Sequence, residues 1–133
     1  MDDQLYSKIK QVLQDFDQLA GEGKPVCLFI TGADLAILAA LRQPGVPVRI
    51  EHMAKGKAYT CARMGCSTAA LHQRLITEKL SLADFMDQGL TSMQGGVPFL
   101  SPEGAILAGI GVSGRLPEED EALALKIRDI LAS

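Results

Sequence analysis

The stretch from Gly95 to Asp120, GGVPFLSPEGAILAGIGVSGRLPEED, constrains the fold more than any other part of this chain. Two apolar runs, 97–100 and 105–112, flank Ser101-Pro102-Glu103-Gly104, where Pro and Gly occupy positions that a type I turn favours. This pattern predicts a β-hairpin. The residues from Pro117 to Ala132 begin with acidic side chains and carry apolar ones at helical spacing, which predicts a final helix.

The glycines Gly109, Gly111 and Gly114 formally match the GxGxxG fingerprint of dinucleotide-binding proteins. That fingerprint opens a βαβ unit and needs an acidic residue about 20 positions later, on a second strand. Only 19 residues follow Gly114, and the predicted helix takes up 16 of them. Three explanations of these glycines remain. Close packing of a helix on the strand is favoured first, contact with a flat ligand second, and a nucleotide-binding loop last.

The rest of the chain predicts more helices and a second hairpin. Apolar residues at helical spacing predict a helix over 3–20, and a stripe of small side chains predicts another over 49–65. The apolar runs 26–30 and 35–41 flank a Gly/Asp turn and predict a hairpin. Shorter elements are expected at 69–76 and 82–88, as helices, and at 91–94, as an edge strand. The expected fold class is α+β, with an antiparallel sheet of about five strands flanked by helices.

Composition narrows the class of function. A chain of 133 residues has the size of one domain, residues 1–133. The net charge is −3, no Lys/Arg cluster exists and tryptophan is absent, which argues against nucleic acid and anionic membranes as partners. A polar N-terminus and the lack of a long apolar run predict a cytoplasmic protein without a membrane span. The three cysteines are expected to be reduced and buried, and no metal site is expected.

Three side chains are candidates for a catalytic or ligand-binding role. His52 could ligate haem iron or act as a general base, but a surface or partly buried histidine is the favoured interpretation. Lys57 leaves two interpretations open, a contact with an anionic ligand group or a stem that packs while its head reaches water. Ser113 lacks the GxSxG frame because position 115 is arginine, so we expect a turn, capping or ligand-binding hydroxyl instead of a nucleophile.

These residues together resemble one family. Gly95-Gly96-Val97-Pro98-Phe99, Gly109-Ile110-Gly111-Val112-Ser113-Gly114 and Pro117-Glu118-Glu119-Asp120 are similar to the signature of the GlcG/HbpS-like domain. This haem-degrading domain also occurs at the C-terminus of PduO-type corrinoid adenosyltransferases. The resemblance extends over nearly the whole chain, and Lys57-Ala58 with Thr60 resembles the family's KAxTA helix.

The resemblance implies a profilin-like or PAS-like α-β-α fold, small oligomers, and haem or a corrinoid as ligand. It also implies a haem-ligating histidine in the N-terminal region. Residues 1–50 contain no histidine, so His52 or a cysteine would have to take that role.

The first hypothesis is a non-enzymatic, homo-oligomeric accessory protein that binds haem, a corrinoid or another small anionic molecule. Its site would lie between the 49–65 helix and the glycine-rich strands. The candidate binding residues are Lys57, Gly95, Gly96, Gly111, Ser113, Gly114 and His52. A second hypothesis is a structural accessory subunit whose small-residue stripe forms the oligomer contact. A third is a small-molecule isomerase or lyase with His52 or Lys57 as base.

Overall fold

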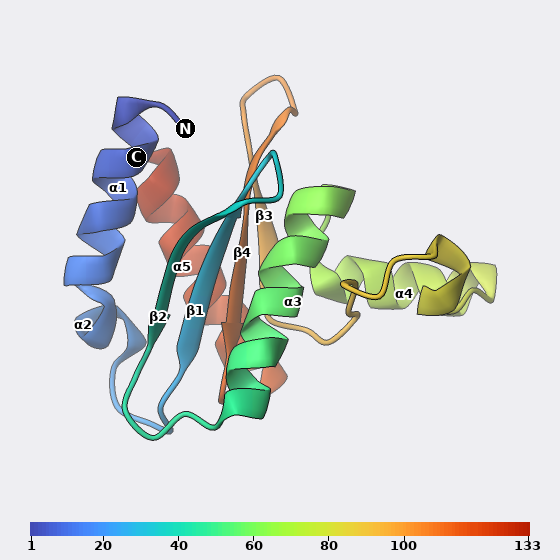
Figure 1. Ribbon diagram of the computed structural model, residues 1–133, viewed down its shortest axis with the longest axis horizontal. Coiled ribbons are helices and arrows are strands. Elements are labelled where there is room, and N and C mark those ends of the chain that lie inside the picture. Colours follow the sequence, from blue (N-terminus) through green and yellow to red (C-terminus); the bar gives the residue numbers. More distant parts are fainter.

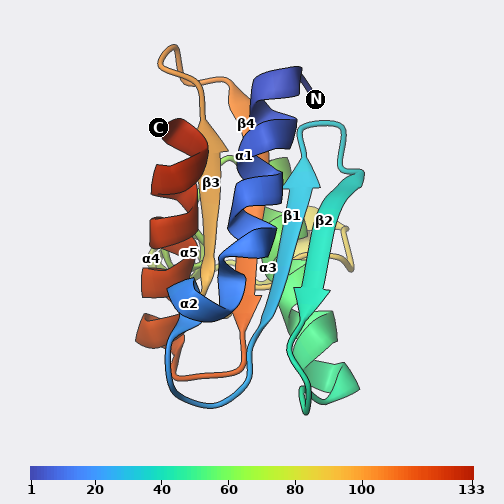
Figure 2. The same cartoon turned by 90° about the vertical axis from the view of Figure 1, so that its left-hand side faces the viewer.

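A four-stranded antiparallel sheet, with strand order β2-β1-β4-β3, forms the centre of the fold. The computed structural model describes residues 1–133. The elements are α1 (Asp3–Gln14), α2 (Phe16–Ala20), β1 (Cys27–Gly32), β2 (Ile37–Arg42), α3 (Val48–Met64), α4 (Thr68–Glu78), the short 3₁₀ helix η1 (Leu82–Phe85), β3 (Gly96–Leu100), β4 (Ile106–Ser113) and α5 (Pro117–Ala132). Figure 1 shows the sheet nearly edge-on, with α1, α2 and α5 on one side and α3 on the other. Figure 2 looks onto the side that α1 and α5 cover.

The expected α+β class is confirmed, but the sheet has four strands and not five. Residues 91–94 form no strand, and two of their backbone amides bond to side-chain hydroxyls. The Thr91 amide donates to Oγ1 of Thr60 at 2.9 Å, and the Met93 amide donates to Oγ1 of Thr91 at 3.2 Å. These side-chain acceptors replace the partners that a neighbouring strand would provide.

Two predicted helices also differ from the structure. The helix expected over 3–20 is divided at Asp15, which ends α1 and precedes α2, and the division leaves Phe16 fully buried. The helix expected over 82–88 is the shorter η1. It ends at Phe85 because Met86 adopts a left-handed conformation with φ of 53°.

Both faces of β1 are covered, which explains its continuous apolar sequence. Leu28 and Ile30 belong to the larger core, which β1, β3 and β4 share with α1 and α5. Cys27 and Phe29 alternate with them and pack with Ala54 of α3 in a smaller core. The sheet therefore separates two cores, as the two-residue side-chain period of a strand requires.

Glycines in β4 let α3 contact this strand directly. A Cβ at Gly109 would collide with the carbonyl oxygen of Ala58 and the amide of Ala62, and a Cβ at Gly111 would collide with the carbonyl oxygen of Ala54. The interpretation of these glycines as packing positions is confirmed. The small-residue stripe of α3 is used inside the subunit, so the oligomer contact that the second hypothesis placed on it is wrong.

On the far side of α3, α4 and η1 project away from the sheet (Figure 1). The large side chains of Ile76 and Met86 in this arm are 58% and 93% exposed. None of the helices combines the length and the apolar composition needed to cross a membrane.

Candidate functional site

Lys57 lies inside the protein, where α3, β4 and α5 meet. Only 3% of the residue is exposed. Its Nζ donates to the carbonyl oxygen of Val112 at 2.8 Å and lies 3.5 Å from Oδ2 of Asp120. Asp120 is equally buried, and its Oδ1 accepts from the backbone amide of Arg115 at 3.0 Å. The ammonium group is therefore held by protein groups, and the interpretation in which it reaches water is wrong.

Burial dominates the electrostatics of this ion pair. It lowers the pKa of Lys57 below its ordinary value and raises the pKa of Asp120 above its own. The attraction between the two charges opposes both shifts. Such a pair keeps its charges only while both partners are in place.

Three of the expected glycines surround Lys57. A Cβ built at Gly95 would lie 2.6 Å from its Nζ, one at Gly96 would lie 2.9 Å from its carbonyl oxygen, and one at Gly111 would lie 3.0 Å from its Cβ. The structure thus brings Lys57, Gly95, Gly96 and Gly111 together, as the sequence suggests. Atoms of α3 occupy the positions next to these glycines, so close packing accounts for them.

Two of the other expected residues adjoin this group, since Ser113 follows Val112 and the Gly114 amide bonds to the Asp120 carboxylate. Ser113 is buried at the end of β4, opposite Cys27 of β1. Gly114 has φ of 136°, and a Cβ there would collide with the carbonyl oxygen of Pro25. His52 is exposed on α3. The structure therefore places Ser113 and Gly114 beside the contacts of Lys57 and places His52 on the exposed face of α3.

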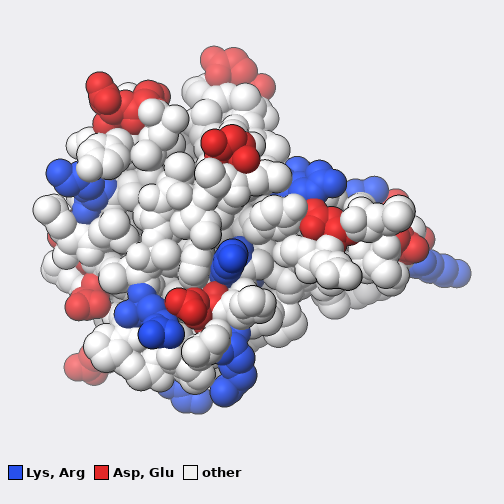
Figure 3. Space-filling model, in the orientation of Figure 1, with Lys and Arg blue, Asp and Glu red and all other residues white.

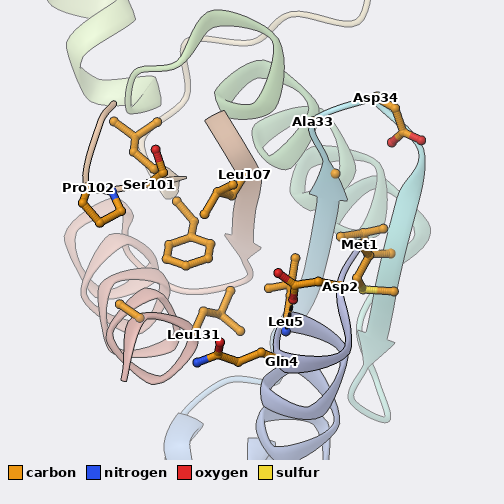
Figure 4. Close-up of a pocket in the computed structure, with 15 residues that line it drawn as sticks. Met1, Asp2, Gln4, Leu5, Ala33, Asp34, Ser101, Pro102, Leu107 and Leu131 are labelled. Carbon is orange, nitrogen blue, oxygen red and sulfur yellow. Dashed lines mark hydrogen bonds between the residues drawn. The ribbon is translucent and has the colours of Figure 1, made fainter. Parts of the chain in front are cut away.

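A cavity of about 850 Å³ lies elsewhere, on the opposite side of the sheet. It opens where the start of α1, the end of α5 and the two hairpin turns meet, and we refer to it as the α1–α5 cavity (Figure 4). None of the residues expected from the sequence lines it. The lining residues are Met1, Asp2, Gln4, Leu5, Gly32, Ala33, Asp34, Leu38, Phe99, Leu100, Ser101, Pro102, Leu107, Leu131 and Ala132.

The wall of the α1–α5 cavity is mainly apolar. Phe99 and Leu131 are buried members of the larger core, and Leu5 and Leu38 pack against that core. Leu107 lines the cavity from β4 and is 38% exposed. A ligand in this cavity would therefore extend the main core of the protein towards the surface.

The only charged side chains in the lining are two carboxylates, Asp2 and Asp34. Oδ1 of Asp2 accepts from the Leu5 amide at 2.7 Å and caps α1, and Oδ1 of Asp34 accepts from the Ala36 amide at 3.1 Å in the β1–β2 turn. Neither carboxylate takes part in any ion pair. Acidic side chains also stand at this end of the molecule in Figure 3, over the start of α1 and the two hairpin turns.

Both the sequence and the fold of this chain resemble those of known proteins. A family model described as "Haem degrading protein HbpS-like" matches residues 7–128. No curated protein matches the sequence. Several solved structures share the fold. The PduOC:Heme complex has a TM-score of 0.76 at 21% identity and covers 98% of this chain and 94% of its own.

Two further solved structures have nearly the same TM-score. A double mutant of Streptomyces reticuli HbpS has a TM-score of 0.72 at 26% identity, covering 96% of this chain and 81% of its own. Klebsiella pneumoniae protein ORFY has a TM-score of 0.73 at 18% identity, covering 98% and 86%. The likenesses to PduOC and to ORFY show the fold alone.

Proposed function

This chain belongs to the HbpS-like haem-degrading family, and we propose that it binds a small, largely apolar molecule in the α1–α5 cavity. The observation that carries the proposal is the cavity itself. Its volume of about 850 Å³ falls within the range of roughly 300–1,000 Å³ that small-molecule sites occupy. Its apolar wall with a few polar groups at the rim is also typical of such sites.

Haem is the ligand that the family suggests, and one similar structure is a complex with haem. Haem iron takes an imidazole, thiolate, phenolate or thioether ligand. The cavity lining contains no His, Cys or Tyr, and Met1 offers its only thioether. Its charged side chains, Asp2 and Asp34, have the same sign as the haem propionates, and the one opposite charge in the lining is the N-terminal ammonium of Met1. Haem therefore finds no good iron ligand in the α1–α5 cavity, and the haem hypothesis rests on His52, exposed on α3, or on a cysteine.

A neutral fluorescent probe tests the proposed site. The protein contains no tryptophan, so the emission of naphthylethanol can be followed without a tryptophan background. We expect saturable binding that Leu107→Asn weakens, because this change puts an amide in the apolar wall. Leu116→Asn is the matched control, since Leu116 is 59% exposed and does not line the cavity. Failure of the probe to saturate, or equal binding by the Leu107→Asn variant, would refute the proposal.

A hemin titration tests the haem hypothesis separately. A Soret shift that saturates at one haem per subunit and is lost in His52→Ala would support haem binding through His52. His72→Ala is the control, since His72 is the other histidine of the chain and is also exposed. A spectrum identical to that of free hemin would exclude haem and leave the apolar ligand as the proposal.

We also propose that the protein is a homo-oligomer whose contact is made by the α4–η1 arm. Ile76 and Met86 expose large apolar side chains on this arm, which projects from the body (Figure 1). Contiguous exposed apolar surface marks interaction sites on soluble proteins, and these two side chains would supply it on this arm. The small-residue stripe of α3 cannot make the contact, because it is packed on β4.

A further inference from the structure

We propose that β2 is a pairing edge, at which two copies of this chain join β2 to β2 antiparallel and form one continuous sheet. The inference goes beyond the proposed function, because it concerns the outer edge of the sheet instead of the cavity or the α4–η1 arm. It follows from the position of β2. This strand pairs with β1 alone, and its other side is open in Figure 2.

The outer side of β2 carries backbone groups that have no partner within the chain. The Gln43 amide, directly after β2, donates inward to the carbonyl oxygen of Val26. Successive residues of an antiparallel strand direct their amide and carbonyl groups to opposite sides. Ala40 and Arg42 therefore direct theirs outward, away from β1. Only another extended strand can supply partners for such a row of groups.

The opposite edge of the sheet is protected, whereas β2 is not. The edge strand β3 contains Pro98, which has no amide hydrogen to offer to a further strand. The Gly96 amide of β3 already donates to Oγ1 of Thr68, at the start of α4, at 3.0 Å. In contrast, β2 contains neither proline nor lysine, and residues 37–41 are all apolar. An edge without these protective features is the one that pairs with another chain.

The charges around β2 favour a second copy of the same strand as the partner. Antiparallel pairing about Ala40 brings the β1–β2 turn of each copy towards the end of β2 in the other. The turn carries the exposed Asp34, and the far end of β2 carries the exposed Arg42 and, just beyond it, Arg49. Arg42 lies 3.8 Å from Glu51, but none of the ion pairs within the chain involves Asp34 or Arg49. Opposite charges therefore approach each other at both ends of the pair.

Exposed apolar side chains at the same two ends favour this partner as well. Ile37, near the turn, is 49% exposed, and Val48, at the start of α3, is 68% exposed. The antiparallel arrangement brings Ile37 of one subunit towards Val48 of the partner subunit, so that both lose contact with water. Pairing of identical edges about a two-fold axis also uses both free edges, so the assembly closes at two chains.

Light scattering of the Ile76→Asp/Met86→Asp protein isolates this contact, because these substitutions remove only the contact proposed for the arm. We expect this variant to be a dimer. Addition of Ala40→Lys should halve its mass, since like charges would face each other at the centre of the pair. Ala40 is exposed and directs its backbone groups away from β1, so the subunit stays folded. Ala105→Lys, at an exposed alanine of the β3–β4 turn, is the matched control and should keep the dimer.

Cross-linking tests the antiparallel arrangement itself. Opposite residues of a hydrogen-bonded antiparallel pair have Cα atoms about 5.5 Å apart, within the roughly 4.4–6.8 Å that a disulfide spans. Ala40→Cys treated with diamide should therefore give a disulfide-linked dimer on a non-reducing gel. Ala105→Cys is the control. Both variants keep the three native cysteines, so a link through any of these would appear in the control as well.

Each outcome has one meaning. A monomeric Ile76→Asp/Met86→Asp protein would overturn the pairing of two copies at β2 and leave this edge to a strand of a different protein. A dimer that survives Ala40→Lys, or equal cross-linking of the two cysteine variants, would also overturn it. Loss of the dimer in Ala105→Lys would show a general effect of charge and overturn the role of this edge. Ligand binding in the α1–α5 cavity is measured separately, so failure of the proposed function remains distinguishable.

Discussion

Nζ of Lys57 and Oδ2 of Asp120 lie 3.5 Å apart, and their side chains are 4% and 3% exposed. This ion pair joins α3 on one side of the sheet to the start of α5. Asp120 also accepts from the Arg115 amide, and the Arg115 guanidinium donates to the carbonyl oxygens of Ala20, Gly21 and Lys24. One polar network therefore connects α3, the β4–α5 junction and the end of α2.

Replacement of Lys57 by methionine should lower the free energy of unfolding by about 3–5 kcal/mol, because it leaves the Asp120 carboxylate buried without its partner. Urea unfolding followed by circular dichroism measures the change. The exposed Lys55 of the same helix provides the control, and Lys55→Met should change stability by less than about 0.5 kcal/mol. The double variant Lys57→Met/Asp120→Asn should recover part of the loss. A Lys57→Met protein as stable as the parent would contradict the role of the pair.

This pair marks a limit of sequence-based prediction. The acidic residues at 118–121 suit the positive end of a helix, and local electrostatics accounts for Glu118 and Glu119. Nothing local separates Asp120 from them. Its partner Lys57 is 63 positions away, so the pair exists only once the fold has brought α3 and α5 together. The burial of Lys57 could not be predicted either. The sequence left open whether its ammonium group contacts an anionic ligand or reaches water.

Gly111→Ala should destabilise the protein by about 1–3 kcal/mol or more, because the new methyl group would enter the backbone of α3. Gly56→Ala is the informative comparison. Gly56 lies inside α3, and a Cβ there would be 3.5 Å from Thr91 Cγ2, an ordinary contact. This change should stabilise the protein by about 0.5–1 kcal/mol, since alanine favours the helix. Thermal unfolding of both variants measures the effects, and a Gly111→Ala protein of parental stability would show that α3 can shift.

The contribution of the Cys27 thiol to stability should decrease as the pH rises above 9.0, its ordinary pKa. Burial raises the pKa of Cys27 to about 11 in the folded protein. Between these values the unfolded chain releases a proton that the folded protein keeps, so the free energy of unfolding falls with pH, by up to about 1.4 kcal/mol per pH unit. The stabilisation is fully present below pH 9.0.

Cys27→Ala should make this decrease shallower between pH 9 and 11, which urea unfolding at several pH values can measure. Lys57 acts in the opposite direction, because burial lowers its pKa and favours the folded protein as the pH rises towards 10.5. The comparison is therefore made between parent and variant, which share Lys57. Identical slopes in the two proteins would show that the Cys27 thiol ionises without hindrance in the folded state.

Light scattering coupled to gel filtration should show an oligomer that Ile76→Asp/Met86→Asp dissociates. Both side chains are exposed in the α4–η1 arm, so the substitutions place charges in the proposed contact without entering a core. Tyr6→Asp/Leu116→Asp is the control, since Tyr6 and Leu116 are 53% and 59% exposed on other elements. A parent protein that elutes as a monomer at all concentrations would refute the oligomer. Dissociation by the control variant would refute the location.

Much of the fold could be predicted because its signals are local. The hairpin of β3 and β4 follows from its turn residues, and α5 begins at Pro117 as expected. The stripe of small side chains in α3 correctly indicated a helix close to the sheet. Residues 91–94 could not be predicted, because the hydroxyl of Thr60, 31 positions before Thr91, takes the bond that a strand would have formed.

The α1–α5 cavity could not be predicted from the sequence for a different reason. Its wall comes from the start of α1, both hairpin turns, all four strands and the end of α5, and each contributes only a few residues. Asp2 and Asp34 look like ordinary cap and turn residues in the sequence, and they do serve as such. That both also line the cavity depends on the assembled fold, which brings the start of α1 beside the β1–β2 turn.

Because α3 contacts Gly109 and Gly111 directly, one side of the sheet is tightly constrained and the other side is more tolerant of substitution. Any larger side chain in that contact would move a whole helix, so few substitutions there are compatible with the fold. The rim of the α1–α5 cavity comes from the ends of elements and the hairpin turns, where partly exposed side chains such as Leu107 can be exchanged without moving a helix. This architecture allows ligand preference to diverge among proteins of the same fold while the frame that supports it stays unchanged.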